Sequence, residues 1–397
     1  KWELIVAGLF AICLAILIVK KNWVKNLFLL LAFVLPLSSN FSIGGLDLML
    51  PAEWIIGVLT LVLLFDILNK KNYQLILKNP LPALWIISFV LPLILSSIFM
   101  VSLKFTLLNG VFVLTFFYGT LRFGKGEVLK WLKLYFVAFF LAVLWGGYQF
   151  LNFDFNPDTI SGIFKPFYYS NTYVGATAAL LSGFALGSGR VDKRYFVLAI
   201  VALAIIIFSE SRAALISFMV MLIAYLFSFF SLKIRLILPA LLIMIVLVFG
   251  SKNISESFTY NKIESHNPDA NIFEETLSVT NVQSDVSNIE RLNRWLSAIR
   301  MFQDKPHWGF GPGTYQFTYI PFQEPKLMNR LSVRNPDNIP KGSGGSAHSE
   351  LLLQLSENGW PSTAIFIIIF LVWVYRGYLS IGDLQIKRLP FFLGLIT

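Results

Sequence analysis

Apolar runs long enough to cross a lipid bilayer recur along most of the chain, and they limit its possible folds more than any other feature. A transmembrane helix needs about 17–25 predominantly apolar residues. Only 14% of the 397 residues are charged, against roughly 25% in a soluble domain. The sequence therefore predicts an all-α polytopic membrane protein with about 11–12 transmembrane helices. The expected spans are Trp2–Val19, Val24–Leu37, Pro51–Leu68, Leu81–Phe99, Phe105–Leu121, Trp131–Leu151, Tyr173–Leu186, Tyr195–Phe208, Arg212–Phe230, Ile234–Phe249, Gly359–Tyr375 and one that begins at Pro390 and is cut off at Thr397.

Basic residues gather in every second connection between these runs, as in Lys20–Lys25, Lys70–Lys78 and Arg190–Arg194. Lys and Arg accumulate in cytoplasmic loops, so the net charge of +10 reflects topology rather than a nucleic-acid partner. The same rule places the N-terminus outside, which indicates that the chain lacks an initial segment. The connections expected to face the other side are Ser38–Leu50, Asn152–Thr172, Ser209–Ser211 and Ser251–Ala347.

The only large hydrophilic connection is Ser251–Ala347, and it divides the chain into three parts. We expect a transmembrane bundle over residues 1–250, a large loop with short helices over 251–347, and C-terminal transmembrane helices over 348–397, the last one truncated. Within the loop, Ile289–Phe302 has apolar residues at a helical period. Its apolar face suits a helix that lies on or re-enters the membrane surface. That face consists of Leu292, Trp295, Leu296 and Ile299.

Three side chains stand out as candidates for chemistry, and each has an ordinary structural alternative. Arg212 either reaches to headgroups or pairs with Glu210, or its planar guanidinium binds a phosphate. Arg291 either lies on a solvated face or binds a ligand. His348 is either an interfacial histidine with a satisfied ring or a group that exchanges protons near neutral pH. We expect no metal site, since neither the single cysteine nor any His/Asp/Glu spacing suits one.

Several motifs together resemble the O-antigen ligase and O-antigen polymerase superfamily. They occur in the family's order between Gly162 and Gly359, whereas the first 150 residues match only as generic membrane helices. The segment from Phe164 to Asn171 departs from the family's shorter polar approach to its Asn. The blocks that carry the resemblance are His348-x8-Glu357-x-Gly359, Arg291-x3-Trp295, the turn Gly309–Gly313, Ser211-Arg212-x-Ala214, and Gly162-x-Phe164 followed by Asn171.

The resemblance implies a bacterial membrane glycosyltransferase of the GT-C type in the inner membrane, with its active site facing the periplasm. Such enzymes move a glycan from a polyprenyl diphosphate to an acceptor hydroxyl without a metal or other cofactor. By this resemblance His348 is the catalytic base. Arg212 and Arg291 bind the diphosphate, with Arg294 a weaker candidate. The residues expected to support them are Glu210, Glu350, Asn171 and Tyr169.

The acceptor distinguishes the possible functions. A ligase transfers the glycan to lipid A–core, a polymerase to another polyprenyl-linked repeat, and a protein O-glycosyltransferase to Ser or Thr. We favour the ligase, because a compact single loop closing on His348 suits it. The rivals from other classes are a lipid or glycan transporter, which would place buried arginines near the bilayer midplane, and a non-catalytic membrane scaffold.

Overall fold

The chain folds into two compact units. The computed structural model describes residues 22–43, 46–69, 73–156, 159–160, 162–189, 192–227, 229, 281, 284–335 and 345–382. One unit comprises residues 1–79, 111–223 and 386–397, and the other comprises 80–110 and 224–385. The expected spans Trp2–Val19 and Ile234–Phe249, and the one from Pro390, lie outside the described residues.

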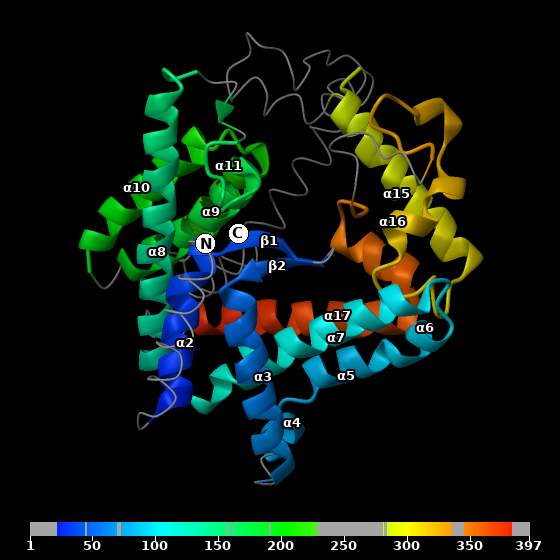
Figure 1. The fold of residues 1–397 in the computed structure, drawn as a ribbon, viewed down its shortest axis with the longest axis horizontal. Helices are drawn as coiled ribbons and strands as arrows, with labels where there is room; N and C mark the ends of the chain where they lie inside the picture. Colours follow the sequence, from blue (N-terminus) through cyan, green and yellow to red (C-terminus); the bar gives the residue numbers. More distant parts are fainter. Residues whose placement is uncertain are drawn as a thin grey trace. The chain divides into compact units, whose positions relative to one another are not determined.

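The first unit is a helical bundle with one hairpin (Figure 1). Its long apolar helices coincide with predicted spans, and small residues along α9 let α10 pack closely against it. Its elements are α2 (Trp23–Val34), η1 (Leu35–Leu37), β1 (Ser39–Ile43), β2 (Leu46–Leu50), α3 (Ala52–Asn69), α4 (Gln74–Lys78), the π-helical segment η2 (Val113–Tyr118), η3 (Thr120–Arg122), α8 (Lys125–Asn152), α9 (Asn171–Gly189), α10 (Arg194–Phe208) and α11 (Arg212–Phe227).

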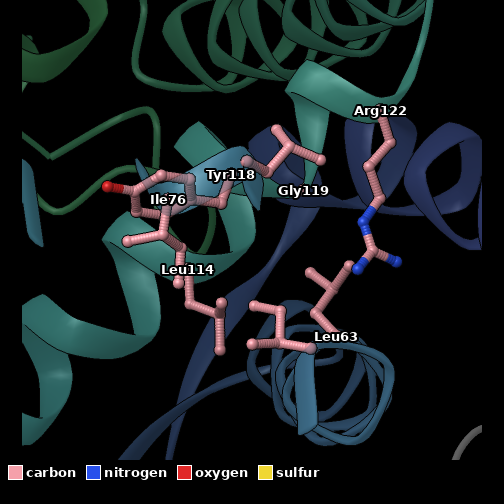
Figure 2. A pocket seen from close by; sticks show the side chains of 8 residues that line it. Leu63, Ile76, Leu114, Tyr118, Gly119 and Arg122 are labelled. Carbon is pink, nitrogen blue, oxygen red and sulfur yellow. The ribbon is translucent and has the colours of Figure 1, made fainter. Parts of the chain in front are cut away.

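Aromatic packing joins α2 to α8 in this unit. Phe28 stacks on Trp131 with ring centroids 4.9 Å apart, and both side chains are buried. The hairpin was not predicted; it occupies the connection Ser38–Leu50, with Ser39 opposite Leu50. Ser38 ties the hairpin to α3, because its hydroxyl accepts a hydrogen bond from the amide of Ala52 at 3.2 Å. Elsewhere in the unit, a small and mostly apolar pocket lies between α3, α4 and η2, and contains none of the predicted site residues (Figure 2).

The second unit combines membrane helices with the folded part of the large loop. Figure 1 shows α5 and α6 running beside α17, and α15, which packs against α17, lying at an angle to it. Its elements are α5 (Leu81–Ser88), α6 (Val90–Ile94), α7 (Phe99–Phe112, which continues into the first unit), α15 (Val286–Asp304), α16 (Tyr315–Thr318), η6 (Ile320–Phe322), η7 (Pro325–Leu327) and α17 (Glu350–Gly382).

The predicted span Leu81–Phe99 is broken into α5 and α6, and α7 begins at Phe99 rather than Phe105. Pro92 has no amide hydrogen to donate to the carbonyl of Ser88, four residues earlier. The hydroxyl of Ser362 in α17 donates to that carbonyl at 3.0 Å. A backbone acceptor freed by proline within a membrane segment is thus satisfied by a neighbouring helix.

In the described part of the chain, three helices are long and apolar enough to cross a membrane: Phe99–Arg122, Gly126–Asn152 and Glu350–Arg376. Shorter apolar helices accompany them at Trp23–Leu37, Leu81–Ile94, Arg194–Phe208 and Arg212–Leu226. Large apolar side chains point outward, as Leu144 does with 68% of its surface exposed. These features confirm the predicted all-α polytopic membrane protein.

Candidate functional site

Arg212 is the first residue of α11 and follows a tight turn that is held from α9. Asn171 donates its side-chain amide to the carbonyl of Ser209 at 2.8 Å, at the end of α10. Glu210 in the turn has a left-handed backbone with φ of 50°. Gly175 leaves room for the turn, because a Cβ there would approach Ser209 Oγ to 2.7 Å. The turn therefore places Arg212, which is half-buried, at a defined helix start.

Of the other predicted residues in this region, Glu210 and Tyr169 are exposed at the surface. Asn171, expected on the sugar side of the site, uses its amide nitrogen to tether the turn. Asn171 can therefore influence the site by fixing the position of Arg212. The first unit thus groups Asn171, Ser209 and Arg212 around one turn.

The predicted loop helix is present as α15, with an N-terminal cap. The Asp285 carboxylate accepts a hydrogen bond from the amide of Asn288 at 3.0 Å. The predicted apolar face points outward: Trp295 is 40% exposed and Ile299 39%. The residues facing inward are mostly polar: Asn288, Glu290, Asn293, Arg294, Ser297, Ala298 and Met301. The loop region therefore packs around a hydrogen-bonded centre.

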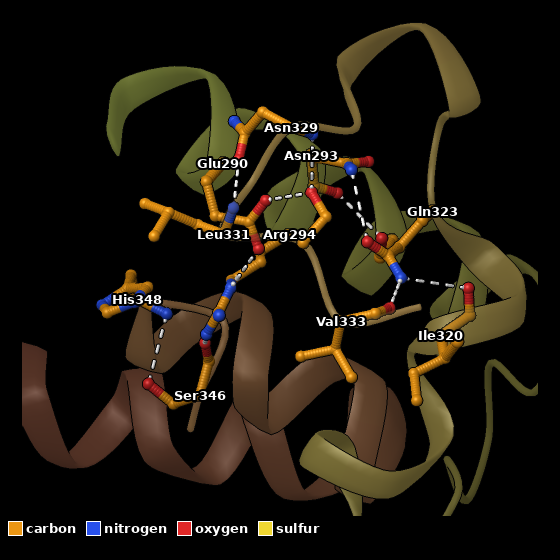
Figure 3. A network of polar contacts seen from close by, with 12 residues as sticks. Glu290, Asn293, Arg294, Ile320, Gln323, Asn329, Leu331, Val333, Ser346 and His348 are labelled. Atoms are coloured by element: carbon orange, nitrogen blue, oxygen red, sulfur yellow. Dashed lines mark hydrogen bonds and ion pairs between the residues drawn. The ribbon is translucent and has the colours of Figure 1, made fainter. Parts of the chain in front are cut away.

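Arg294 lies at that centre (Figure 3). Its side chain is 2% exposed, and its Nε donates to Glu290 Oε1 at 3.1 Å. Nη1 donates to the carbonyl of Ser346 at 3.0 Å. Glu290 in turn accepts a hydrogen bond from the Ser332 hydroxyl at 2.6 Å. A buried charge is tolerated only when it is paired and hydrogen-bonded, and Arg294 meets both conditions.

His348 lies beside this network, two residues before α17. Its backbone is left-handed with φ of 53°, and its amide donates to Ser346 Oγ at 3.3 Å. Although the residue is exposed at the surface, neighbouring atoms remove part of the water around the ring. This desolvation, followed by repulsion from Arg294 and Arg291, lowers the pKa of His348 from 6.5 to about 4. The imidazole is therefore neutral at pH 7 and can accept a proton.

Glu357 holds the glycine-rich turn against α17, a role that the sequence did not assign to it. Its carboxylate accepts hydrogen bonds from the amides of Gly313 at 2.8 Å and Tyr315 at 2.9 Å. Its carbonyl accepts a third from Gly311, also at 2.8 Å. The available signal was an acidic residue in an apolar helix, where a charge is expensive unless it is bound.

The remaining predicted residues of the second unit are Arg291, which is half-buried on α15, and Glu350. Glu350 begins α17 and accepts a hydrogen bond from Gln354 at 2.9 Å. The structure thus gathers Arg291, Arg294 and His348 into one electrostatically linked group. Within the described ranges, no three or more His, Cys, Asp or Glu side chains gather where they could hold a metal ion.

Fold and site together define a polytopic helical membrane protein with a folded loop that presents arginines and a neutral histidine. Residues 197–367 match the protein family described as O-antigen ligase. The match begins within α10, ends within α17 and includes Arg212, Arg291, Arg294 and His348. It confirms the resemblance to the O-antigen ligase superfamily and supports glycan transfer in a membrane. Comparisons with curated proteins and with solved structures found no match.

Proposed function

We propose that this chain is a metal-independent glycosyltransferase that acts as an O-antigen ligase on the periplasmic face of the bacterial inner membrane. The donor is a glycan on a polyprenyl diphosphate, and the acceptor is a hydroxyl of lipid A–core. The match over residues 197–367 supports the reaction class. The observation that carries the chemistry is the neutral His348 held beside Arg291, because it combines a proton acceptor with fixed positive charge.

The reaction divides between these groups. The acceptor oxygen attacks the anomeric carbon of the donor sugar, and the bond from that carbon to the diphosphate breaks with its electrons on the diphosphate. His348 takes the proton of the attacking hydroxyl, which is otherwise a poor nucleophile. Arg212 and Arg291 bind the diphosphate and stabilise the charge it gains. Each charge-assisted hydrogen bond contributes about 1.5–3 kcal/mol.

Of the supporting residues, Asn171, Glu210 and Glu350 act through Arg212 or His348, and Tyr169 acts on the sugar. Glu210 belongs to the turn before α11, and Asn171 holds that turn from α9, so both position Arg212. Tyr169 is exposed two residues before the start of α9. It offers an aromatic ring and a hydroxyl to the sugar. Glu350 supports the start of α17, two residues after His348.

The test is transfer by purified protein in detergent with EDTA present. Wild type is compared with Arg212→Ala, Arg291→Ala, His348→Ala and, as a matched control, Arg330→Ala, an exposed arginine of the same loop. Lipid A–core and a second polyprenyl-linked repeat are offered separately. We expect transfer to lipid A–core that survives EDTA, is lost in the three site variants and persists in Arg330→Ala.

Each other outcome contradicts part of the proposal. Transfer only to the second repeat would make the protein a polymerase. Activity that persists in His348→Ala would remove the base assignment, and activity abolished by EDTA would remove the metal-free mechanism. No transfer to either acceptor by folded wild type would favour a protein acceptor or a transporter.

A further inference from the structure

We propose that Arg294 is a positioning residue that fastens the segment carrying His348 to α15, and that it does not bind the donor diphosphate. The inference rests on the proposed function for the role of His348, and it adds a separate role for the second arginine of α15. Arg291 and Arg294 lie three residues apart in the sequence, which offers both as diphosphate ligands, Arg294 as the weaker candidate. The structure separates them by burial.

The burial of Arg294 argues against a ligand role. Its side chain is 2% exposed, whereas Arg291 is only half-buried. The guanidinium is bound between the Glu290 carboxylate and the Ser346 carbonyl, and its carbon lies 5.7 Å from the centre of the Tyr319 ring. The backbone of Arg294 is held as well, because its carbonyl accepts a hydrogen bond from the Tyr315 hydroxyl at 2.8 Å. A diphosphate would have to displace these partners from a buried position.

The contact with Ser346 is made in a part of the segment whose backbone is strained. Gly345 and His348 both have positive φ values, 130° and 53°. A non-glycine residue adopts such a backbone at a cost and persists in it when surrounding contacts determine it. The Arg294–Ser346 hydrogen bond lies between these two residues (Figure 3). It therefore sets the place from which the chain turns into His348.

The charge of Arg294 also reaches the imidazole. The charged groups that act on His348 are Arg294 and Arg291, both from α15, and each disfavours its protonated form. Glu290 opposes this effect through its pairing with Arg294. On the α17 side the nearest acidic residue in sequence is Glu350, which bonds with Gln354. Removal of the Arg294 charge should therefore raise the pKa of His348, while desolvation and Arg291 still hold it below its ordinary value.

The experiment compares three variants in the full-length protein. Arg294→Gln removes the charge, and Arg294→Lys keeps the charge but loses the planar fork. The double variant Glu290→Gln/Arg294→Gln removes both charges, so that no carboxylate is left buried without its partner. The matched control is Arg300→Gln, because Arg300 is on the same helix and binds Glu324 at 2.5 Å and the Phe322 carbonyl at 3.1 Å, away from His348.

The first measurement does not need activity. Diethyl pyrocarbonate modifies neutral imidazole, and mass spectrometry of the His348 peptide gives the modification rate at pH 5.5 and pH 7.5. We expect a ratio of rates near one in wild type and in Arg300→Gln. In Arg294→Gln and the double variant the ratio should fall below the wild-type value. It stays above about one tenth, the value for a pKa of 6.5, because desolvation and Arg291 still lower the pKa of His348.

The second measurement is the kinetics of transfer. A positioning role predicts that kcat falls on the order of 10–100-fold in Arg294→Gln and in the double variant, with the donor KM little changed. Arg294→Lys should recover part of kcat. A raised donor KM with unchanged kcat and an unchanged modification ratio would overturn the proposal and make Arg294 a diphosphate ligand. If wild type transfers no glycan while the modification ratio still shifts, the proposed function fails and the positioning role stands.

Discussion

At the scale of single residues, the pKa of His348 determines how the protein responds to acid. Its value of about 4 lies below the ordinary 6.5, because desolvation and two arginines disfavour the charged ring. We therefore predict that the rate of glycan transfer is nearly constant from pH 8 to pH 5.5 and falls as the pH approaches 4. A pH–rate profile with saturating donor measures this. A rate that halves near pH 6.5 would contradict the lowered pKa of His348.

The same residue links pH to folding. Between pH 6.5 and 4 the unfolded chain binds a proton at His348 that the folded chain does not. Its contribution therefore destabilises the fold as the pH falls through this window, and it is absent above it. The variant His348→Gln lacks this contribution. Its melting temperature in detergent should depend less on pH than that of wild type between pH 6.5 and 4.

At the scale of elements, α15 buries its mostly polar face and exposes its apolar face. Ala298 lies on the buried side at 0% exposure, and Ile299 lies on the outward side. We predict that Ala298→Leu destabilises the purified protein by about 1–3 kcal/mol through overpacking. Ile299→Ala should change the stability by less than about 0.5 kcal/mol. Thermal unfolding followed by tryptophan fluorescence compares them, and equal losses would mean that both faces are packed.

The break in α17 gives a second prediction at this scale. Gly359 has φ of 71° and ψ of −178°, a region that is nearly restricted to glycine, and a Cβ there would collide with the carbonyl of His307. Gly359→Ala should cost about 1–3 kcal/mol and separate the glycine-rich turn from α17. The matched control is Gly147→Ala in α8, where a Cβ meets nothing within 4 Å. An unchanged melting temperature for Gly359→Ala would show that the kink is not required.

The sequence predicted those elements whose own pattern specifies them. Long apolar runs identified the membrane helices, and the 3.6-residue period identified α15. It missed what depends on partners distant in the chain: Ser362 stabilises the break before Val90, and Glu357 binds the turn at Gly313. For the same reason it ranked Arg294 as a weaker diphosphate ligand than Arg291 without showing that Arg294 is buried. Periodicity shows that a helix has two faces, and only packing decides which one is buried.

At the scale of the whole molecule, the proposed site requires that residues from both compact units face the same compartment. Arg212 belongs to the first unit, and Arg291 and His348 belong to the second. The alternation of basic connections places the Ser209–Ser211 turn and the large loop outside, and the connection around Asp192 inside. We predict this arrangement from charge, because the cost of moving lysine and arginine across the bilayer sets the orientation of the helices.

Single-cysteine labelling in intact cells tests this arrangement. With Cys13→Ser as background, Glu210→Cys and Arg330→Cys should react with a membrane-impermeant maleimide that enters the periplasm. Asp192→Cys should react only after the inner membrane is permeabilised, and all three positions are exposed or partly exposed. Labelling of Glu210→Cys and Arg330→Cys from opposite sides would place Arg212 and His348 in different compartments. A single site containing both residues would then be impossible, however well the loop chemistry suited glycan transfer.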